Sequence, residues 1–187
     1  MRAAVYHSNR DVRVVEIPRP VPGPGEILVR VRASGICGSD LMEWYRRPRA
    51  PLVLGHEVAG EVAQTGPGVR DLRRGDRVVT THHVPCGRCR LCLTGRETCC
   101  PRLSVNHFDP GGFAEFVRVG EEAVRRGTFR LPPRTTFAEG SFVEPLACVL
   151  RAQRLAGLAP RDAVAMLGGG VSGLLHLLAA GAASRWS

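Results

Sequence analysis

Four cysteines in one short loop constrain this chain more than any other feature of its sequence. They follow one another at intervals of three, three and eight residues, in a segment rich in glycine and arginine: Cys86, Cys89, Cys92 and Cys100. Four thiolates at this spacing can surround a Zn²⁺ ion tetrahedrally, and a four-cysteine site with no open position is structural rather than catalytic. The sequence therefore predicts a structural zinc site.

Two alternatives for this loop compete with the zinc interpretation. An iron–sulfur cluster fits the first three cysteines, and Cys100-Pro101 is similar to the end of a ferredoxin motif, but the fourth cysteine is too distant. Cys99 competes with Cys100 as the fourth ligand, and we favour Cys100. Two histidines precede the loop, His82 and His83, and we interpret them as part of a solvated turn.

The composition excludes several classes of function. All 26 basic residues of this 187-residue chain are arginine, so a lysine Schiff base and a lysine-containing P-loop are excluded. The net charge is +9, but the arginines are scattered and not interleaved with aromatic residues, so we expect no nucleic-acid partner. Residues 1–11 contain no apolar leader, and with the clustered cysteines this predicts a cytoplasmic, metal-binding protein.

Residues 1–143 have the pattern of a mainly β domain. Short apolar segments at 27–32, 58–63, 76–81 and 113–119 are separated by turns rich in glycine and proline. The first segment alternates, so we expect its even- and odd-numbered side chains on opposite faces: Ile27, Val29 and Val31 inward, Arg30 and Arg32 outward. Many short strands with frequent turns indicate a barrel or sandwich.

Residues 144–187 change in character toward an α/β unit. We predict a helix over 144–156, a strand over 163–167 and a second helix over 171–183, with Gly157 ending the first helix. The glycine pattern between strand and helix fits the dinucleotide fingerprint, in which the backbone approaches a pyrophosphate at the helix start: Gly168, Gly170, Val171 and Gly173. Residues 163–183 carry no charge and are long enough to span a bilayer, but their glycine run argues against a membrane helix.

A second candidate metal site is distributed along the chain. Cys37 lies in the motif Gly-Ile-Cys-Gly-Ser-Asp and His56 in Gly-His-Glu, and each motif alone is a weak signal. Together with Glu144 they offer a thiolate, an imidazole and a carboxylate. Three protein ligands leave one position of a zinc ion open, as catalysis requires.

These motifs, taken in order, resemble the zinc-dependent medium-chain dehydrogenases. The matching segments are 35–40, 55–57, 75–78, the four-cysteine loop, 111–115 and 144–147, and the Glu-Pro pair at 144–145 is most similar to the sorbitol and threonine dehydrogenase branch. The resemblance implies a GroES-like catalytic domain at 1–143 and, at 144–187, a linking helix with an incomplete nucleotide-binding (Rossmann) domain. It implies a catalytic zinc at Cys37, His56 and Glu144 and a structural zinc at the four cysteines.

The resemblance also implies a reaction. A zinc-bound small alcohol or polyol would transfer hydride to NAD or NADP, Ser39 would pass on the alcohol proton, and Glu57 would lie close to the zinc. Relatives often have a histidine at the end of the proton path where this chain has Met42, so the path would run through Asp40, Glu43, water or cofactor hydroxyls. The competing hypothesis is a catalytically silent zinc-binding GroES-like module. A metal-free quinone-reductase-type relative is disfavoured by the two ligand sets.

One departure concerns the cofactor domain. The acidic residue expected about 20 residues after the glycines has no counterpart, because Asp162 is the last acidic residue. We therefore expect a truncated member of the family. Four leucines that would cover a sheet in a longer relative are then left facing water: Leu174, Leu175, Leu177 and Leu178. Folding of this helix back on the barrel and docking on a partner are alternatives, and we favour self-association into homo-oligomers.

Overall fold

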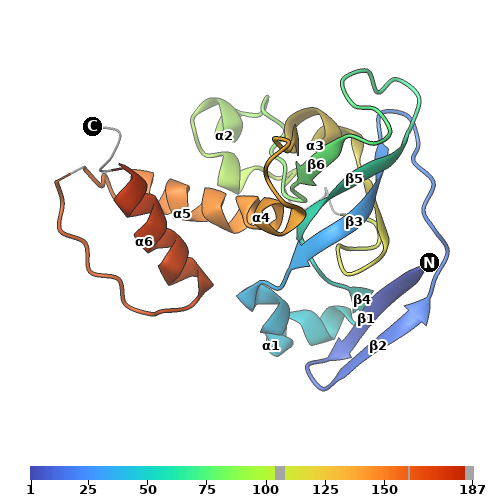
Figure 1. Ribbon diagram of the computed structural model, residues 1–187, viewed down its shortest axis with the longest axis horizontal. Helices are drawn as coiled ribbons and strands as arrows, with labels where there is room; N and C mark the ends of the chain where they lie inside the picture. The colour runs from blue at the N-terminus through green and yellow to red at the C-terminus, as the bar shows by residue number, and fades with distance from the viewer. Residues whose placement is uncertain (104–107, 160, 184–187) are drawn as a thin grey trace. The chain divides into compact units, whose positions relative to one another are not determined.

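The computed structural model describes residues 1–103, 108–159 and 161–183, and the chain forms two compact units, Met1–Ser141 and Phe142–Ser187. The first unit is built on two antiparallel sheets (Figure 1). The five-stranded sheet has the order β7-β3-β5-β6-β8, with bounds Phe116–Val119, Ile27–Gly35, Glu57–Thr65, Arg77–Thr80 and Thr128–Arg130. The three-stranded sheet has the order β2-β1-β4, with bounds Asp11–Glu16, Arg2–Ser8 and Leu52–Val53.

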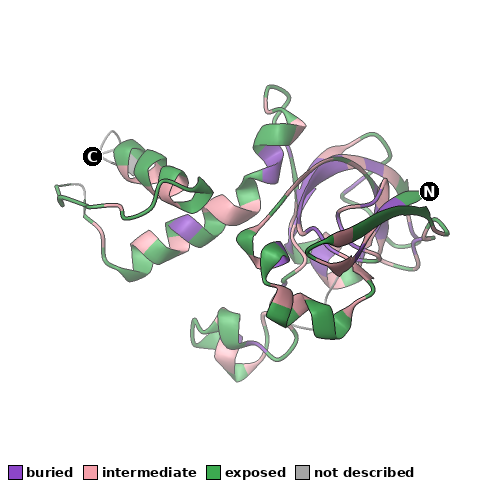
Figure 2. Cartoon of the chain, turned by 90° about the horizontal axis from the view of Figure 1, so that it is seen from below, coloured by how far each residue is buried: buried purple, intermediate pink, exposed green. Residues whose placement is uncertain are grey.

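The core of this unit lies on the five-stranded sheet, and the residues of β3 predicted to face inward and outward do so. Leu28 departs from the alternation: it is fully buried, and the pairing of β3 with β5 shifts register between Leu28 and Val29. Ile27 and Val29 are fully buried, Val31 packs against the core, and Arg30 and Arg32 are exposed. The buried partners come mainly from the neighbouring strands, as Figure 2 shows by the concentration of buried residues in the strands: Val58, Val62, Val78, Val117 and Val119. Burial of each such side chain stabilises the fold by roughly 1.5–3 kcal/mol.

The two sheets are joined by the segment that precedes β7. Ala114 forms an isolated bridge with Ala3 of β1, and the Glu115 amide donates to the Arg2 carbonyl at 3.1 Å. The predicted strand over 113–119 therefore pairs first with β1 and enters the five-stranded sheet only at Phe116. Short helical segments connect the strands: η1 Gly38–Leu41, α1 Glu43–Arg46, η2 Arg47–Arg49, α2 Arg90–Leu93, η3 Glu97–Cys99, α3 Glu121–Arg126 and α4 Phe137–Ser141.

The described part of the second unit contains two helices of 13 residues, α5 Val143–Leu155 and α6 Val171–Ala183. The predicted helices are thus confirmed, and Gly157 follows α5 with φ +67, the left-handed conformation that glycine adopts at a helix end. The side-chain amide of Gln153 donates to the His176 carbonyl at 2.8 Å, which ties α5 to α6.

The predicted strand over 163–167 is wrong. These residues have no regular secondary structure, and Leu167 is 96% exposed. A strand is stabilised by ladder hydrogen bonds to a neighbour, and in the described part of this unit there is no other strand for 163–167 to pair with. The apolar composition of residues 163–167 is therefore not sufficient for them to form a strand. Among the described residues, no helix is long and apolar enough to cross a membrane.

Candidate metal centres

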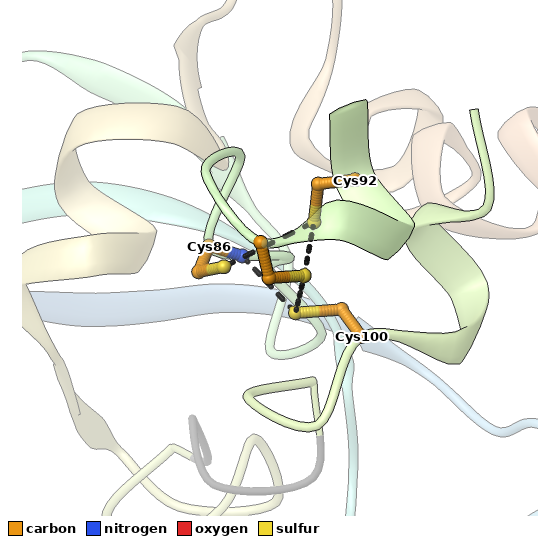
Figure 3. Close-up of side chains that lie close together, drawn as sticks. Cys86, Cys92 and Cys100 are labelled. Atoms are coloured by element: carbon orange, nitrogen blue, oxygen red, sulfur yellow. Dashed lines mark hydrogen bonds between the residues drawn. The ribbon is translucent and has the colours of Figure 1, made fainter. Parts of the chain in front are cut away.

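The four loop cysteines converge as the spacing predicts. The sulfur atoms of Cys86, Cys89, Cys92 and Cys100 all lie within 4.8 Å of one another (Figure 3). Individual separations are 3.5 Å for Cys89–Cys92, 3.9 Å for Cys89–Cys100 and 4.0 Å for Cys86–Cys92. Zinc–sulfur bonds of about 2.3 Å place the corners of a tetrahedron about 3.8 Å apart. The arrangement therefore fits a four-thiolate zinc ion.

Local backbone structure brings these cysteines together. Cys89 caps the start of α2, Cys92 lies within that helix, and η3 immediately precedes Cys100. The Cys86 amide donates to the Cys100 sulfur at 3.4 Å, whereas Cys99 is exposed and lies outside the group. The backbone amides of Arg88 and Cys89 lower the pKa of the Cys86 thiol to about 6, which favours a thiolate at that corner.

Gly87 lets an arginine close over the cysteine loop. Its φ of +69 is in the left-handed region that favours glycine. A β-carbon at this position would also collide with the guanidinium of Arg126 at the end of α3. The loop thus folds beneath a positive charge, which favours an anionic thiolate cluster.

The second group of donor atoms lies where β3 ends and β5 begins. Cys37 follows β3 and caps η1, His56 precedes β5, and Glu57 is the first residue of β5. The two strands are antiparallel, and Gly35 pairs with Glu57, so the ends of the two motifs meet. One donor atom from each of Cys37, His56 and Glu57 lies within 4.8 Å of the others.

The absence of a side chain at Gly35 creates space for this group. The carboxylate of Glu57 occupies the position that a β-carbon of residue 35 would take. Glu57 is 8% exposed, so its carboxylate is held inside the unit beside Cys37 and His56. A buried carboxylate is stable only with a positive or hydrogen-bonding partner.

Asp40 supplies a second buried carboxylate next to the same histidine. Its Oδ1 lies 3.6 Å from Nδ1 of His56, and its Oδ2 accepts a hydrogen bond from the Cys37 amide at 3.1 Å. Burial lowers the pKa of His56, but Asp40 and then Cys37 outweigh it and raise the pKa to about 9. The negative groups that stabilise protonated His56 would also stabilise a divalent cation at this position. A thiolate, an imidazole and a carboxylate are all ligands that zinc accepts.

The other predicted site residues lie as follows. The Ser39 amide approaches the Cys37 sulfur at 3.5 Å, so Ser39 is a neighbour of the second group. Glu144 lies in the first turn of α5, in the other unit, and its role as a ligand stays a prediction. Gly168 and Gly170 lie directly before α6 and Gly173 lies in its first turn, where a β-carbon would collide with the Gly168 carbonyl.

Two residues were missed or misinterpreted from the sequence. The sequence places His82 in a solvated turn, but this residue is half-buried and its ring centroid lies 4.8 Å from that of His56. Arg46 contacts both Ser39 and Asp40, and no motif in the sequence points to it. The segment between Cys37 and His56 gave no signal for Arg46, because an arginine among other exposed arginines has no distinguishing spacing.

Comparisons with known proteins all point to dehydrogenases. Residues 23–129 match the family described as the alcohol dehydrogenase GroES-like domain. The chain is 35% identical over 189 residues to a sorbitol dehydrogenase of Bacillus subtilis, covering 96% of this chain and 52% of the relative. It is 36% identical over 180 residues to an L-threonine 3-dehydrogenase of Pyrococcus furiosus, covering 92% and 50%.

A solved structure from Sinorhizobium meliloti 1021, described as a zinc-binding dehydrogenase bound to NADP, superposes with a TM-score of 0.82 at 36% identity, covering 97% of this chain and 53% of that one. The chain spans about half the length of the curated relatives it matches. The expected fold is confirmed, with the mainly β unit as its GroES-like part. Because the family match extends over more than half of its residues, the chain belongs to the alcohol dehydrogenase GroES-like domain family.

Proposed function

We propose that this chain carries the metal centres of a zinc-dependent alcohol or polyol dehydrogenase that uses NAD or NADP as hydride acceptor. The observation that carries the proposal is the convergence of Cys37, His56 and Glu57 in a family member that also holds a separate four-cysteine cluster. A closed four-sulfur set suits a structural ion, and a mixed set suits a catalytic ion with an open position. The relatives named as sorbitol and threonine dehydrogenases support a small hydroxylated substrate.

Each residue of the mixed group has a distinct task in this proposal. Cys37 and His56 would hold the zinc ion, and Glu57, whose donor atom lies in the same group, would be an alternative oxygen donor. The resemblance to the family adds Glu144 as the third ligand. A bound zinc ion supplies Lewis-acid activation of an alcohol toward loss of its proton. Asp40 lies beside Nδ1 of His56, so Nε2 would be the ring nitrogen available to the metal. The Ser39 hydroxyl would pass on the alcohol proton.

The dinucleotide is proposed to approach the turn before α6. Gly168, Gly170, Val171 and Gly173 would place their backbone at the pyrophosphate, because helix starts offer free amide groups to anions. The unpaired segment 163–167 favours a second candidate function, a zinc-binding module without dehydrogenase activity. A dinucleotide fingerprint normally follows a strand, and here that strand is not formed.

One assay distinguishes these two functions. The zinc-loaded chain is incubated with sorbitol and with L-threonine in the presence of NAD⁺ or NADP⁺, and reduced nicotinamide is measured. Turnover that is lost on replacing Cys37 with serine, and retained on replacing the exposed Cys99 with serine, supports the dehydrogenase. A chain that binds zinc at both centres but reduces no cofactor supports the silent module.

A further inference from the structure

Arg46 makes a set of contacts that distinguishes it from the other arginines around it. Its Nε donates to the Ser39 carbonyl at 3.0 Å, and its Nη2 donates to the Ser39 hydroxyl oxygen at 3.1 Å. The same Nη2 lies 3.6 Å from Oδ1 of Asp40. The Arg46 side chain is 17% exposed, whereas the neighbouring Arg47 is an exposed residue. Arg46 thus closes over η1, the turn that carries Ser39 and Asp40.

These contacts determine how the Ser39 hydroxyl can be used. A guanidinium has only donors and stays protonated, so the Ser39 oxygen must accept from Arg46 and cannot donate to it. The hydroxyl proton is left to point in another direction. The second bond, to the Ser39 carbonyl, fixes the backbone at the same residue, and two bonds from one rigid guanidinium restrict orientation more than one bond does.

The same guanidinium connects to the predicted metal ligands. Asp40 contacts Arg46 and His56 through one carboxylate oxygen and the Cys37 amide through the other. With 3% of its side chain exposed, Asp40 is a buried anion, and Arg46 is the permanent cation beside it. Arg46 therefore links the hydroxyl of Ser39 to the turn that positions Cys37 and His56.

We propose that Arg46 is a positioning residue of the candidate catalytic site: it directs the Ser39 hydroxyl to donate a hydrogen bond to an oxygen of a ligand held beside Cys37 and His56. Ser39 is then a directed donor, and no proton passes onward through Arg46, which accepts none. This inference rests on the proposed function, because it requires a ligand oxygen at that site.

The test uses acetate as an oxygen ligand for the metal-loaded chain. The four-cysteine centre is filled with zinc and the mixed centre with Co²⁺, whose visible absorption reports acetate binding. Replacing Ser39 with alanine should weaken acetate binding roughly tenfold, the loss expected for one hydrogen bond to a charged group. Arg46→Met should weaken it to a similar degree in the native background, and Arg47→Met, which removes the same charge from a neighbouring exposed position, should change it less than about twofold.

The double variant separates positioning from simple charge attraction. If Arg46 acts through Ser39, then Arg46→Met has no further effect on acetate binding once Ser39 is alanine. An undiminished effect of Arg46→Met in the Ser39→Ala background would overturn the proposal, because a general electrostatic or folding role does not depend on the hydroxyl. Retention of zinc by the four-cysteine centre shows that each variant is folded.

A measurement on the metal-free chain makes failure of the proposal distinguishable from failure of the proposed function. The Arg46 Nε–H should exchange slowly with solvent in nuclear magnetic resonance spectra, because it is bonded to the Ser39 carbonyl. Rapid exchange overturns the positioning role directly. A chain with slow exchange but no Co²⁺ at Cys37 and His56 contradicts the proposed function, and with it the ligand-directed role of Ser39.

Discussion

Oδ1 of Asp40 lies 3.6 Å from Nδ1 of His56, and the two side chains are only 3% and 12% exposed. This contact, rather than the spacing of the motifs, explains how a histidine in a loop before β5 keeps a fixed orientation. Replacing Asp40 with asparagine removes the charge while nearly preserving the shape. We expect the folded chain to lose about 1.5–3 kcal/mol, the range for a hydrogen bond to a charged group, because the charge is removed both from the hydrogen bond that Asp40 accepts from the Cys37 amide and from its ion pair with His56.

In the metal-free chain, the loss of folding stability caused by Asp40→Asn should decrease as the pH rises. The pKa of His56 is raised from 6.5 to about 9, so its protonation stabilises the folded state fully below pH 6.5, and this contribution disappears as the pH rises through about 9. The stability difference between the native chain and Asp40→Asn should therefore shrink between these values. Chemical denaturation in the presence of a chelator measures it, and a difference that grows toward pH 9 contradicts the role of Asp40.

Two glycines that flank Ile36 and Cys37 allow a matched test of the mixed metal centre. A β-carbon at Gly35 collides with the Glu57 carboxylate, while a β-carbon at Gly38 has nothing within 4 Å. Gly35→Ala should displace Glu57 and lower the affinity of the Cys37–His56 centre for Co²⁺ about tenfold or more, since supporting contacts of this kind are worth that much. Gly38→Ala should leave the affinity within about twofold. Equal affinities in the two variants would show that Glu57 does not contribute.

The isolated segment 163–167 leads to an expectation about cofactor affinity. Dinucleotide sites of this type place the pyrophosphate between a strand and the following helix, and here the helix α6 is formed but the strand before it is not. We expect NAD⁺ and NADP⁺ to bind to this chain no more tightly than about 1 mM, or about −4 kcal/mol. Titration calorimetry measures this, and micromolar binding would show that the described turn and helix suffice.

The exposed leucines of α6 predict self-association. Leu174, Leu177 and Leu178 are 54%, 60% and 69% exposed, whereas Leu175 is half-buried, so three of the four predicted water-facing leucines are exposed. Covering each of them in an interface contributes up to roughly 1.5–3 kcal/mol. Light scattering should show oligomers of the native chain and a shift toward monomers for Leu177→Gln/Leu178→Gln. A monodisperse native monomer is the contradicting result.

The sequence was informative where a pattern is local. The alternation of residues 27–32 predicted β3, and the cysteine spacing predicted a cluster that the backbone amides and α2 do assemble. The contact between Gly35 and Glu57 was not predictable, because the pairing of β3 with β5 shifts register at two irregularities that no short motif encodes. For the segment 163–167 the sequence predicted an element that the structure does not contain. Its apolar residues fit a strand pattern, but a strand forms only when it pairs with a neighbouring strand.

The sequence also could not determine which of two adjacent cysteines, Cys99 or Cys100, joins the four-cysteine group. Both follow the loop at spacings that allow ligation, and the sequence could only favour one. The turn η3 ends at Cys99, so Cys100 turns inward to 4% exposure while Cys99 remains on the surface. The conformation of one short turn therefore separates two adjacent and chemically identical residues.

The zinc content of the purified chain shows whether both donor groups hold a metal ion. Two separate donor groups predict two zinc ions per chain by elemental analysis. Cys37→Ser should remove one ion and leave the fold intact, whereas Cys92→Ser should lower both zinc content and solubility, because binding at a closed structural site is coupled to folding. Cys99→Ser, the exposed control, should retain both ions. One zinc ion or none in well-folded native protein would contradict the account.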